Sequence, residues 1–174
     1  MKSIEDIKQA IRDVPDFPHK GILFKDITPV LQNAALFGAT VHHLCESVRD
    51  LRADAIAGIE ARGFIFAAAV ADRLNCGFVP IRKPGKLPAK VHQESYTLEY
   101  GTDSVEMHQD AVAPGSAVVL MDDLLATGGT ALASTRLIEK TGVRLIAVRF
   151  LIELDFLKGR DKLSAYAMQS LIHF

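Results

Sequence analysis

The sequence predicts an α/β fold with a Rossmann-like, mostly parallel and twisted sheet that is flanked by helices. Short apolar runs that suit buried strands alternate with segments of helical periodicity, and this rhythm is typical of parallel sheets. The chain has 174 residues and is 49% hydrophobic, which is enough for one well-buried core and a little short for two. We therefore expect a single domain over residues 1–174.

The first predicted elements are a helix and an irregular segment. Ile4, Ile7 and Ile11 recur at helical spacing behind Ser3, a residue that can cap a helix. Prolines at positions 15 and 18 interrupt this pattern, so we expect a loop-like segment up to about residue 29.

From there the strand and helix patterns alternate along the chain. Predicted helices and strands have lengths and apolar faces that suit a sheet covered by helices. The expected helices are residues 37–51, 64–74 and 130–140, and the expected strands are residues 55–59, 77–81, 118–121 and 145–151.

Residues 83–110 break this alternation. They are rich in Lys, Glu, Tyr and Thr and lack a core pattern, which predicts a flexible loop or β-flap. The core is expected over residues 36–153. The remaining segment, residues 154–174, contains Leu157-Lys158-Gly159-Arg160, to which the sequence alone assigns no chemistry.

Composition excludes several classes of function. The net charge of −1 leaves no global positive field that would draw the chain onto nucleic acid or anionic lipid. The N-terminus lacks the apolar run of a signal peptide, and no stretch approaches the ~20 apolar residues of a membrane span, so we expect a cytoplasmic protein. Cys45 and Cys76 lack the spacing of a zinc or redox pair and are expected to be small core hydrophobes.

The most informative stretch is residues 118–130, in which an apolar strand leads into two acids and a Thr-Gly-Gly-Thr turn opens a helix. A helix that starts beyond the carboxyl end of a parallel strand directs backbone N–H groups at an anion, and glycines let a phosphate approach. The adjacent carboxylates can accept hydrogen bonds from sugar hydroxyls. We expect a ribose 5-phosphate site made of Asp122, Asp123, Ala126, Thr127, Gly128, Gly129 and Thr130.

A solvated strand end followed by an ordinary turn is the alternative for each part of this pattern taken alone. The strand, the two acids, the turn and the helix follow one another without interruption, and this combination argues against the alternative. No G-x-G-x-x-G motif follows a strand and no G-x-x-x-x-G-K-[ST] motif occurs, so dinucleotide-binding and P-loop folds are unsupported.

Residues 122–130, Asp-Asp-Leu-Leu-Ala-Thr-Gly-Gly-Thr, resemble the phosphoribosyl diphosphate signature of the type I phosphoribosyltransferases, in the version of members that act on adenine. The resemblance extends from about Phe17 to Arg160. It implies transfer of the 5-phosphoribosyl group from phosphoribosyl diphosphate to adenine, giving AMP and diphosphate in purine salvage. It also implies the type I fold, with a small N-terminal hood over the base at residues 1–35.

A second anion site is expected at the turn of residues 58–64, where Arg62 precedes an apolar helix. Taken alone, Arg62 could simply solvate the start of that helix. The resemblance implies that this turn and the basic run after residue 81 bind diphosphate, with Arg62 also contributing to catalysis. A solvated surface is the alternative for Lys86. The implied diphosphate residues are Glu60, Ala61, Arg62, Arg82, Lys83 and Lys86.

Residues 94–101 resemble the family's catalytic loop. The resemblance implies that Glu99 lies near the purine imidazole edge and transfers the proton, with Tyr100 beside it, while loop closure excludes water from a cation-like sugar. An exposed loop acid is the alternative, since Glu94 and Glu106 lie in the same stretch.

Residues 17–29 are similar to the family's hood segment. The resemblance implies that the backbone at Leu23 reads the amine edge of adenine and that Leu23 and Phe24 supply apolar walls. Lys25 is also an expected adenine contact, but many relatives carry Arg at its position, so its role stays open. These side chains could alternatively be core anchors of an irregular segment.

Magnesium is the expected cofactor because a diphosphate leaving group is highly charged, and we expect substrate oxygens to hold it, with no dedicated protein ligands. The resemblance implies a homodimer. The alternatives are a phosphoribosyltransferase for another purine, such as xanthine or hypoxanthine, and a non-enzymatic, phosphate-responsive α/β module of the receiver type. The receiver order, with the acid pair on the first strand, does not fit this chain.

Overall fold

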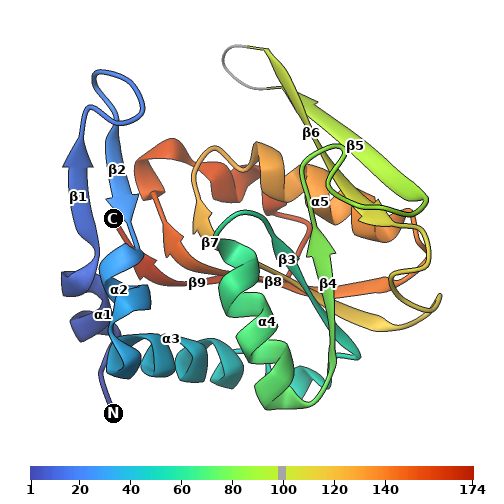
Figure 1. Ribbon diagram of the computed structural model, residues 1–174, viewed down its shortest axis with the longest axis horizontal. Coiled ribbons are helices and arrows are strands. Elements are labelled where there is room, and N and C mark those ends of the chain that lie inside the picture. The colour runs from blue at the N-terminus through green and yellow to red at the C-terminus, as the bar shows by residue number, and fades with distance from the viewer. Residues whose placement is uncertain (98–100) are drawn as a thin grey trace. The chain divides into compact units, whose positions relative to one another are not determined.

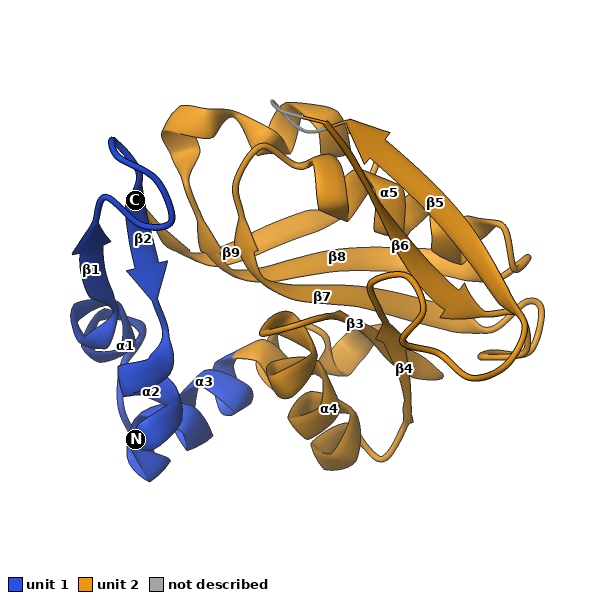
Figure 2. Cartoon of the chain, turned by 45° about the horizontal axis from the view of Figure 1, so that its top comes forward, with its two compact units in different colours: residues 1–43 blue, residues 44–174 orange. Residues whose placement is uncertain are grey.

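The structure is a computed structural model that describes residues 1–97 and 101–174 (Figure 1). The chain forms two compact units, residues 1–43 and residues 44–174, which Figure 2 distinguishes by colour. The boundary falls within helix α3 (Ala34–Glu46), later than the boundary at residue 35 predicted for the N-terminal segment.

The first unit begins with helix α1 (Ile4–Ala10), which Ser3 caps as the sequence predicts. The hydroxyl oxygen of Ser3 accepts a hydrogen bond from the backbone N–H of Asp6. In return, the carboxylate of Asp6 accepts one from the backbone N–H of Ser3. Strands β1 (Arg12–Pro15) and β2 (Leu23–Asp26) then pair in antiparallel fashion, and helix α2 (Thr28–Gln32) follows.

The loop predicted up to residue 29 is therefore wrong, because the segment forms a β-hairpin. Each strand has only four residues, and the first of them is mostly exposed. Strands this short and exposed carry too little apolar alternation to be recognised from sequence. What holds them is pairing across the hairpin, including an ion pair between Arg12 and Asp26.

The second unit is built on a parallel sheet of five strands in the order β4-β3-β7-β8-β9 (Figure 1). A short 3-10 helix, η1 (Arg49–Leu51), precedes the sheet. The strands are β3 (Ala55–Ile59), β4 (Gly77–Ile81), β7 (Ala117–Leu125), β8 (Arg144–Glu153) and β9 (Met168–His173).

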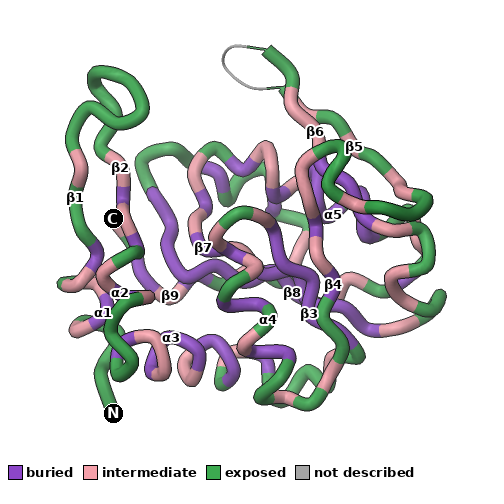
Figure 3. The backbone as a smooth tube through the Cα atoms, in the orientation of Figure 1, coloured by how far each residue is buried: buried purple, intermediate pink, exposed green. Residues whose placement is uncertain are grey.

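Helix α4 (Gly63–Leu74) covers one face of this sheet and helix α5 (Gly129–Glu139) covers the other, as Figure 2 shows. Every residue of β3 is buried, as expected for a strand covered on both faces. Figure 3 shows that buried residues also run along β7 and β8. The predicted α/β class with a mostly parallel, helix-flanked sheet is confirmed.

The order of the strands creates a switch point between β3 and β7. From β3 the chain crosses to β4 on one side, whereas β7 pairs with the other side of β3. At such a point the loops after the two strands diverge and leave a crevice at the carboxyl edge of the sheet, where ligands bind in open α/β folds. These loops are residues 60–62 and 126–129, the second of which includes Gly129, the first residue of α5.

The predicted loop or flap of residues 83–110 contains a β-hairpin. Strands β5 (Val91–Thr97) and β6 (Thr102–His108) pair in antiparallel fashion, with Val91 opposite His108. Backbone hydrogen bonds between Arg82 and Glu106 join the hairpin to the end of β4.

The structure extends the predicted elements in two places. Strand β7 runs on through both acids to Leu125. Residues 154–174, which the sequence left unassigned, form the 3-10 helices η2 (Asp155–Leu157) and η3 (Gly159–Leu163) and the edge strand β9. None of the helices in the described ranges has the length and apolarity that a bilayer crossing requires.

Candidate active site

The loops that follow β3 and β7 enclose a cavity of about 330 Å³ at the switch point. Both walls come from the second unit, and the floor is the carboxyl end of β7. The lining residues are Ile59, Glu60, Ala61, Arg62, Lys83, Asp122, Asp123, Leu124, Leu125, Ala126, Thr127, Gly128, Gly129, Thr130 and Ala131.

The loop of residues 126–129 turns sharply into α5. Gly128 has a φ of 78°, in the left-handed region that glycine adopts without steric cost, and it caps the helix N-terminus. Residues of the first turn line the cavity, and the N–H groups of a first turn have no partner within their own helix. The helix therefore presents N–H donors and the positive end of its dipole to the cavity, as an anion site requires.

Asp122 and Asp123 lie side by side at the floor of the cavity. Asp122 packs against the start of α4 so closely that a Cβ on Gly63 would lie 2.1 Å from its Oδ1. The same Oδ1 accepts a hydrogen bond of 2.8 Å from the N–H of Asp123.

Asp123 is 5% exposed, and Nε of Arg62 lies 2.9 Å from its Oδ2 in an ion pair. That contact lies outside hydrogen-bond geometry, and among the described residues no donor satisfies this buried oxygen. A buried carboxylate oxygen without a hydrogen bond is costly to maintain, and a hydroxyl donor from a ligand would satisfy it.

Burial raises the pKa of both carboxyls. For Asp122 the neighbouring charge of Asp123 raises the pKa further, whereas Arg62 opposes the rise in the pKa of Asp123. Two adjacent carboxylates repel each other, so a ligand with neighbouring hydroxyl groups would stabilise the pair.

The turn after β3 forms the opposite wall. Oε2 of Glu60 accepts hydrogen bonds from the backbone N–H of Lys83 at 2.8 Å and from Nε of Arg82 at 2.6 Å. Burial alone would raise the pKa of Glu60, but these two hydrogen bonds bring the pKa below its usual value. The two hydrogen bonds make Glu60 a fixed anchor that holds the turn against the end of β4. The peptide bond between Glu60 and Ala61 is cis.

Comparison with known proteins identifies the family. The family model for the phosphoribosyl transferase domain matches residues 30–172. An adenine phosphoribosyltransferase of Thermoanaerobacter sp. is 55% identical over 99% of both chains, and one of Nitrosococcus oceani is 53% identical over 98% of this chain and 100% of the other. The chain belongs to the adenine phosphoribosyltransferase family.

Solved structures of this phosphoribosyltransferase family share the fold along the whole chain. The crystal structure of the adenine phosphoribosyltransferase from Thermoanaerobacter pseudethanolicus has a TM-score of 0.96 at 54% identity and covers 99% of this chain and 100% of its own. The Saccharomyces cerevisiae enzyme, solved with an imino-altritol bisphosphate and adenine, has a TM-score of 0.91 at 41% identity and covers 97% of both chains.

In this phosphoribosyltransferase the cavity gathers all the residues predicted for ribose 5-phosphate, together with Glu60, Ala61, Arg62 and Lys83. Two predicted diphosphate residues are not in its lining. Arg82 pairs with Glu60, and its guanidinium carbon lies 5.6 Å from the ring centre of Phe64. Lys86 lies on the exposed loop after β4. Their contact with diphosphate stays a prediction.

Lys83 connects the cavity with the hairpin. Its Nζ donates a hydrogen bond of 2.8 Å to the hydroxyl of Tyr96 and forms an ion pair with Asp103. Burial lowers the pKa of Lys83, but the contacts with Asp103 and Tyr96 raise it above its usual value. The lysine is therefore charged and already ties both strands of the hairpin to the cavity wall.

Glu94 and Glu106, the other two candidates for the proton-transfer carboxylate in this stretch, both have partners outside the cavity. Glu94 forms an ion pair with Lys140 at the C-terminal cap of α5, and the carboxylate of the buried Glu106 accepts a hydrogen bond of 3.0 Å from Gly85 N–H. Glu99 itself and Tyr100 lie outside the described residues, so their roles stay predictions.

The predicted adenine residues lie in the first unit. Leu23 is 48% exposed. The rings of Phe24 and Phe17 meet edge to face, with 5.0 Å between their centres. Nζ of the buried Lys25 lies 2.6 Å from Oδ1 of Asp13. The Lys25 ammonium thus forms an ion pair across the β1–β2 hairpin. Contact of these residues with adenine stays a prediction.

Sequence reasoning missed several residues of the site. Ile59, Leu124, Leu125 and Ala131 line the cavity although they are apolar. Only their positions at strand ends and in the first turn of α5 could have indicated them, because side chains of this kind carry no chemical signature.

Proposed function

We propose that the chain transfers the 5-phosphoribosyl group from phosphoribosyl diphosphate to adenine and releases AMP and diphosphate, a reaction of purine salvage. The observation that carries the proposal is the cavity in which a helix N-terminus meets two adjacent acids, the half-buried Asp122 and the buried Asp123. The curated relatives named as adenine phosphoribosyltransferases support the choice of base.

The two halves of the cavity would bind the two polar parts of the ribose 5-phosphate. The N–H groups at the start of α5, with the hydroxyls of Thr127 and Thr130, would donate to the phosphate. Asp122 and Asp123 would accept from the ribose diol, which would supply a donor to Oδ2 of Asp123, a buried oxygen that has no hydrogen bond among the described residues. The sugar would then lie with its anomeric carbon toward the turn after β3.

In the reaction the bond between the anomeric carbon and diphosphate breaks, and an imidazole nitrogen of adenine bonds to that carbon and loses its proton. Positive charge develops on the sugar as the diphosphate leaves, so the neighbouring carboxylates favour the transition state electrostatically. Glu99 would receive the proton of the base. The engagement of Glu94 and Glu106 elsewhere supports Glu99 as the carboxylate of this stretch that remains for the task.

Arg62 and Lys83 would bind the diphosphate. Both line the cavity, and Arg62 sits where α4 begins, so its guanidinium and the first N–H groups of the helix would bind an anion together. The remaining basic residues, Arg82 and Lys86, would act on the rim.

The cavity suits a Mg²⁺ ion that is held mainly by substrate oxygens. Its carboxylates have other partners: Glu60 accepts hydrogen bonds from Arg82 and Lys83, Asp123 forms an ion pair with Arg62, and Asp122 and Asp123 would bind the ribose diol. When bound, Mg²⁺ would neutralise charge on the leaving diphosphate. Assembly as a homodimer and a cytoplasmic location stay predictions.

An assay of AMP formation tests the proposed function. Purified protein is incubated with phosphoribosyl diphosphate, Mg²⁺ and adenine, with hypoxanthine, guanine and xanthine in parallel, and the nucleotides are separated by chromatography. AMP as the dominant product supports the proposal. A nucleotide from another base instead would change the substrate, and no nucleotide from any base would refute the activity.

A further inference from the structure

The segment after β8 lies directly against the phosphate loop, residues 126–129. Gly159, the first residue of η3, is buried, and a Cβ built on it would lie 2.1 Å from the carbonyl oxygen of Ala126 and 3.0 Å from the backbone nitrogen of Gly128. In return, a Cβ on Gly128 would lie 2.6 Å from the carbonyl oxygen of Gly159. The two segments thus touch backbone to backbone, and a larger residue at either glycine has to displace the other segment.

An ion pair holds Gly159 in this place. Its neighbour Arg160 donates two hydrogen bonds to the carboxylate of Glu153, of 3.0 and 2.6 Å, in the bidentate geometry that gives such pairs direction as well as strength. Glu153 is 3% exposed and ends β8, where it pairs in register with Leu125 on β7. Leu125 immediately precedes the phosphate loop. The same two strand ends therefore position both sides of the contact.

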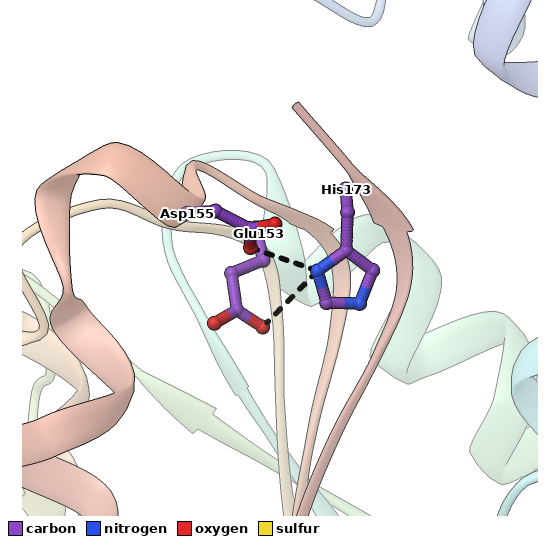
Figure 4. Close-up of side chains that lie close together, drawn as sticks. All are labelled: Glu153, Asp155 and His173. Atoms are coloured by element: carbon purple, nitrogen blue, oxygen red, sulfur yellow. Dashed lines mark hydrogen bonds and ion pairs between the residues drawn. The ribbon is translucent and has the colours of Figure 1, made fainter.

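The C-terminal strand secures the carboxylate of Glu153 from the other side. The hydroxyl of Ser170 donates to Oε2 of Glu153 at 2.6 Å. Figure 4 shows His173 beside Glu153 and Asp155, with Nδ1 of the ring 2.8 Å from Oδ1 of Asp155 and 3.9 Å from Oε2 of Glu153. The carboxylate of Glu153 thus serves Arg160 and Ser170, which argues against this cluster as a metal site.

We propose that Glu153, Gly159 and Arg160 form a positioning brace for the phosphate loop. Gly159 limits how far the phosphate loop can move away from the substrate. The Arg160–Glu153 ion pair keeps Gly159 in contact with that loop. None of the three lines the cavity, so they act through the loop without touching the substrate. The inference rests on the proposed function, because the 5-phosphate is the group that the loop would bind. It assigns a role to Leu157-Lys158-Gly159-Arg160, which the sequence left without one.

Two substitutions test the brace. In Gly159→Ala the new methyl group collides with Ala126 and displaces the loop, whereas Arg160→Ala releases the segment without adding bulk. Both should weaken AMP binding by calorimetry and raise KM for phosphoribosyl diphosphate, by about tenfold or more for Gly159→Ala, since small displacements of binding groups are expensive. Because the phosphate is held equally in ground and transition states, kcat should stay within about threefold.

The controls separate positioning from general damage. Gly142→Ala places a side chain at a φ of 73° in a turn where the nearest atom to the new Cβ is 3.9 Å away, so it strains the fold and leaves the loop untouched. It should keep wild-type AMP affinity. Arg160→Lys should restore part of the affinity lost in Arg160→Ala. Inhibition by diphosphate, for which we propose the other wall of the cavity, should be unchanged in all variants.

Wild-type protein is measured in the same series. Wild type that neither binds nor forms AMP refutes the proposed function itself. If wild type binds AMP and both Arg160→Ala and a folded Gly159→Ala bind it equally well, the brace is refuted while the function stands. If Gly159→Ala does not fold, Arg160→Ala and Arg160→Lys decide: unchanged KM in both would overturn the inference.

Discussion

Nε of Arg62 lies 2.9 Å from Oδ2 of Asp123, so an ion pair joins the turn after β3 to the floor of the cavity. Arg62 is 30% exposed at its side chain, whereas that of Asp123 is 7% exposed. The contact links the residue proposed for diphosphate with one of the two acids proposed for the diol. Each partner offsets the charge of the other, which matters most for the buried Asp123.

Replacement of Arg62 by Ala should damage both binding and stability. The variant loses a diphosphate ligand and leaves Asp123 buried without its ion-pair partner, so KM for phosphoribosyl diphosphate should rise by about tenfold or more and Tm should fall. Steady-state kinetics and thermal unfolding check the two effects. Arg144→Ala is the control. Arg144 begins β8, at the edge of the sheet away from the cavity, and its Nε donates to the carbonyl of Gly115, so KM should be unchanged. Wild-type KM in Arg62→Ala would contradict the assignment.

Replacement of Asp122 by Asn should stabilise the ligand-free protein at neutral pH while it weakens ribose binding. Burial raises the pKa of Asp122, so the folded state holds the proton more tightly than the unfolded state. The contribution of this carboxyl to stability is then full below its unfolded pKa of about 3.9 and is lost as pH rises through the raised value. The isosteric amide is neutral throughout. Tm of the variant should exceed that of wild type at pH 8, by about 2–4 °C for each kcal/mol gained in the free energy of unfolding. The difference between the two Tm values should disappear near pH 4.

Thermal unfolding at both pH values measures this difference, with the exposed Asp110→Asn as the matched control. KM for phosphoribosyl diphosphate should rise in Asp122→Asn only. A lower Tm at pH 8 than wild type would show that the ionised acid stabilises the ligand-free fold, which is the opposite of the effect expected from its burial.

Thr127→Val should weaken AMP binding without disturbing the fold. Thr127 is exposed at the loop, and the isosteric valine removes a hydroxyl donor while it keeps the side-chain volume. Loss of a hydrogen bond to a charged phosphate costs about 1.5–3 kcal/mol, which corresponds to roughly 10–150-fold in affinity. Calorimetry with AMP measures the loss. Thr141→Val removes a hydroxyl that donates to the carbonyl of Ile138 and does not line the cavity, so it should bind AMP normally.

Glu99→Gln should lower kcat with adenine by about 10²–10⁴-fold, the usual contribution of a positioned proton-transfer group. Glu94→Gln is the matched control from the same stretch, since Glu94 pairs with Lys140 at the C-terminal cap of α5. The measurement is the rate of AMP formation at saturating substrates. Near-unchanged turnover in Glu99→Gln would remove the assignment.

Chelation should abolish activity, and added Mg²⁺ should restore it. Donors of the protein neutralise a diphosphate poorly by themselves, and the carboxylates of the cavity have little capacity left for a permanent metal. The chelated protein should therefore unfold at nearly the same temperature as before, while AMP formation stops. Full activity in excess chelator would rule out the proposed cofactor.

The sequence predicts four of the five strands of the central sheet, all but β9, because their signals are local. The runs at β3 and β4 are short, apolar and bounded by polar residues, glycine or proline, and both strands have the predicted bounds. The ribose 5-phosphate residues are likewise contiguous and lie at one strand end, so order along the chain is enough to bring them to one cavity.

Features that depend on distant partners were beyond sequence reasoning. Lys25 pairs with Asp13 and Arg82 with Glu60, and neither partner can be identified without the hairpin or the strand order. The role of Gly159 depends on a backbone contact with a loop formed some thirty residues earlier, which no local pattern encodes. The β1–β2 hairpin was missed for the same reason, since its stability comes from pairing.

Gly63 and Asp122 leave no space between them, because a Cβ at position 63 would fall 2.1 Å from Oδ1 of the acid. The two positions therefore cannot vary independently. Among related chains, a bulkier residue at position 63 should occur only where the acid at 122 has been replaced or shifted. Such covariation would single out, from an alignment alone, the relatives that hold their sugar in another way.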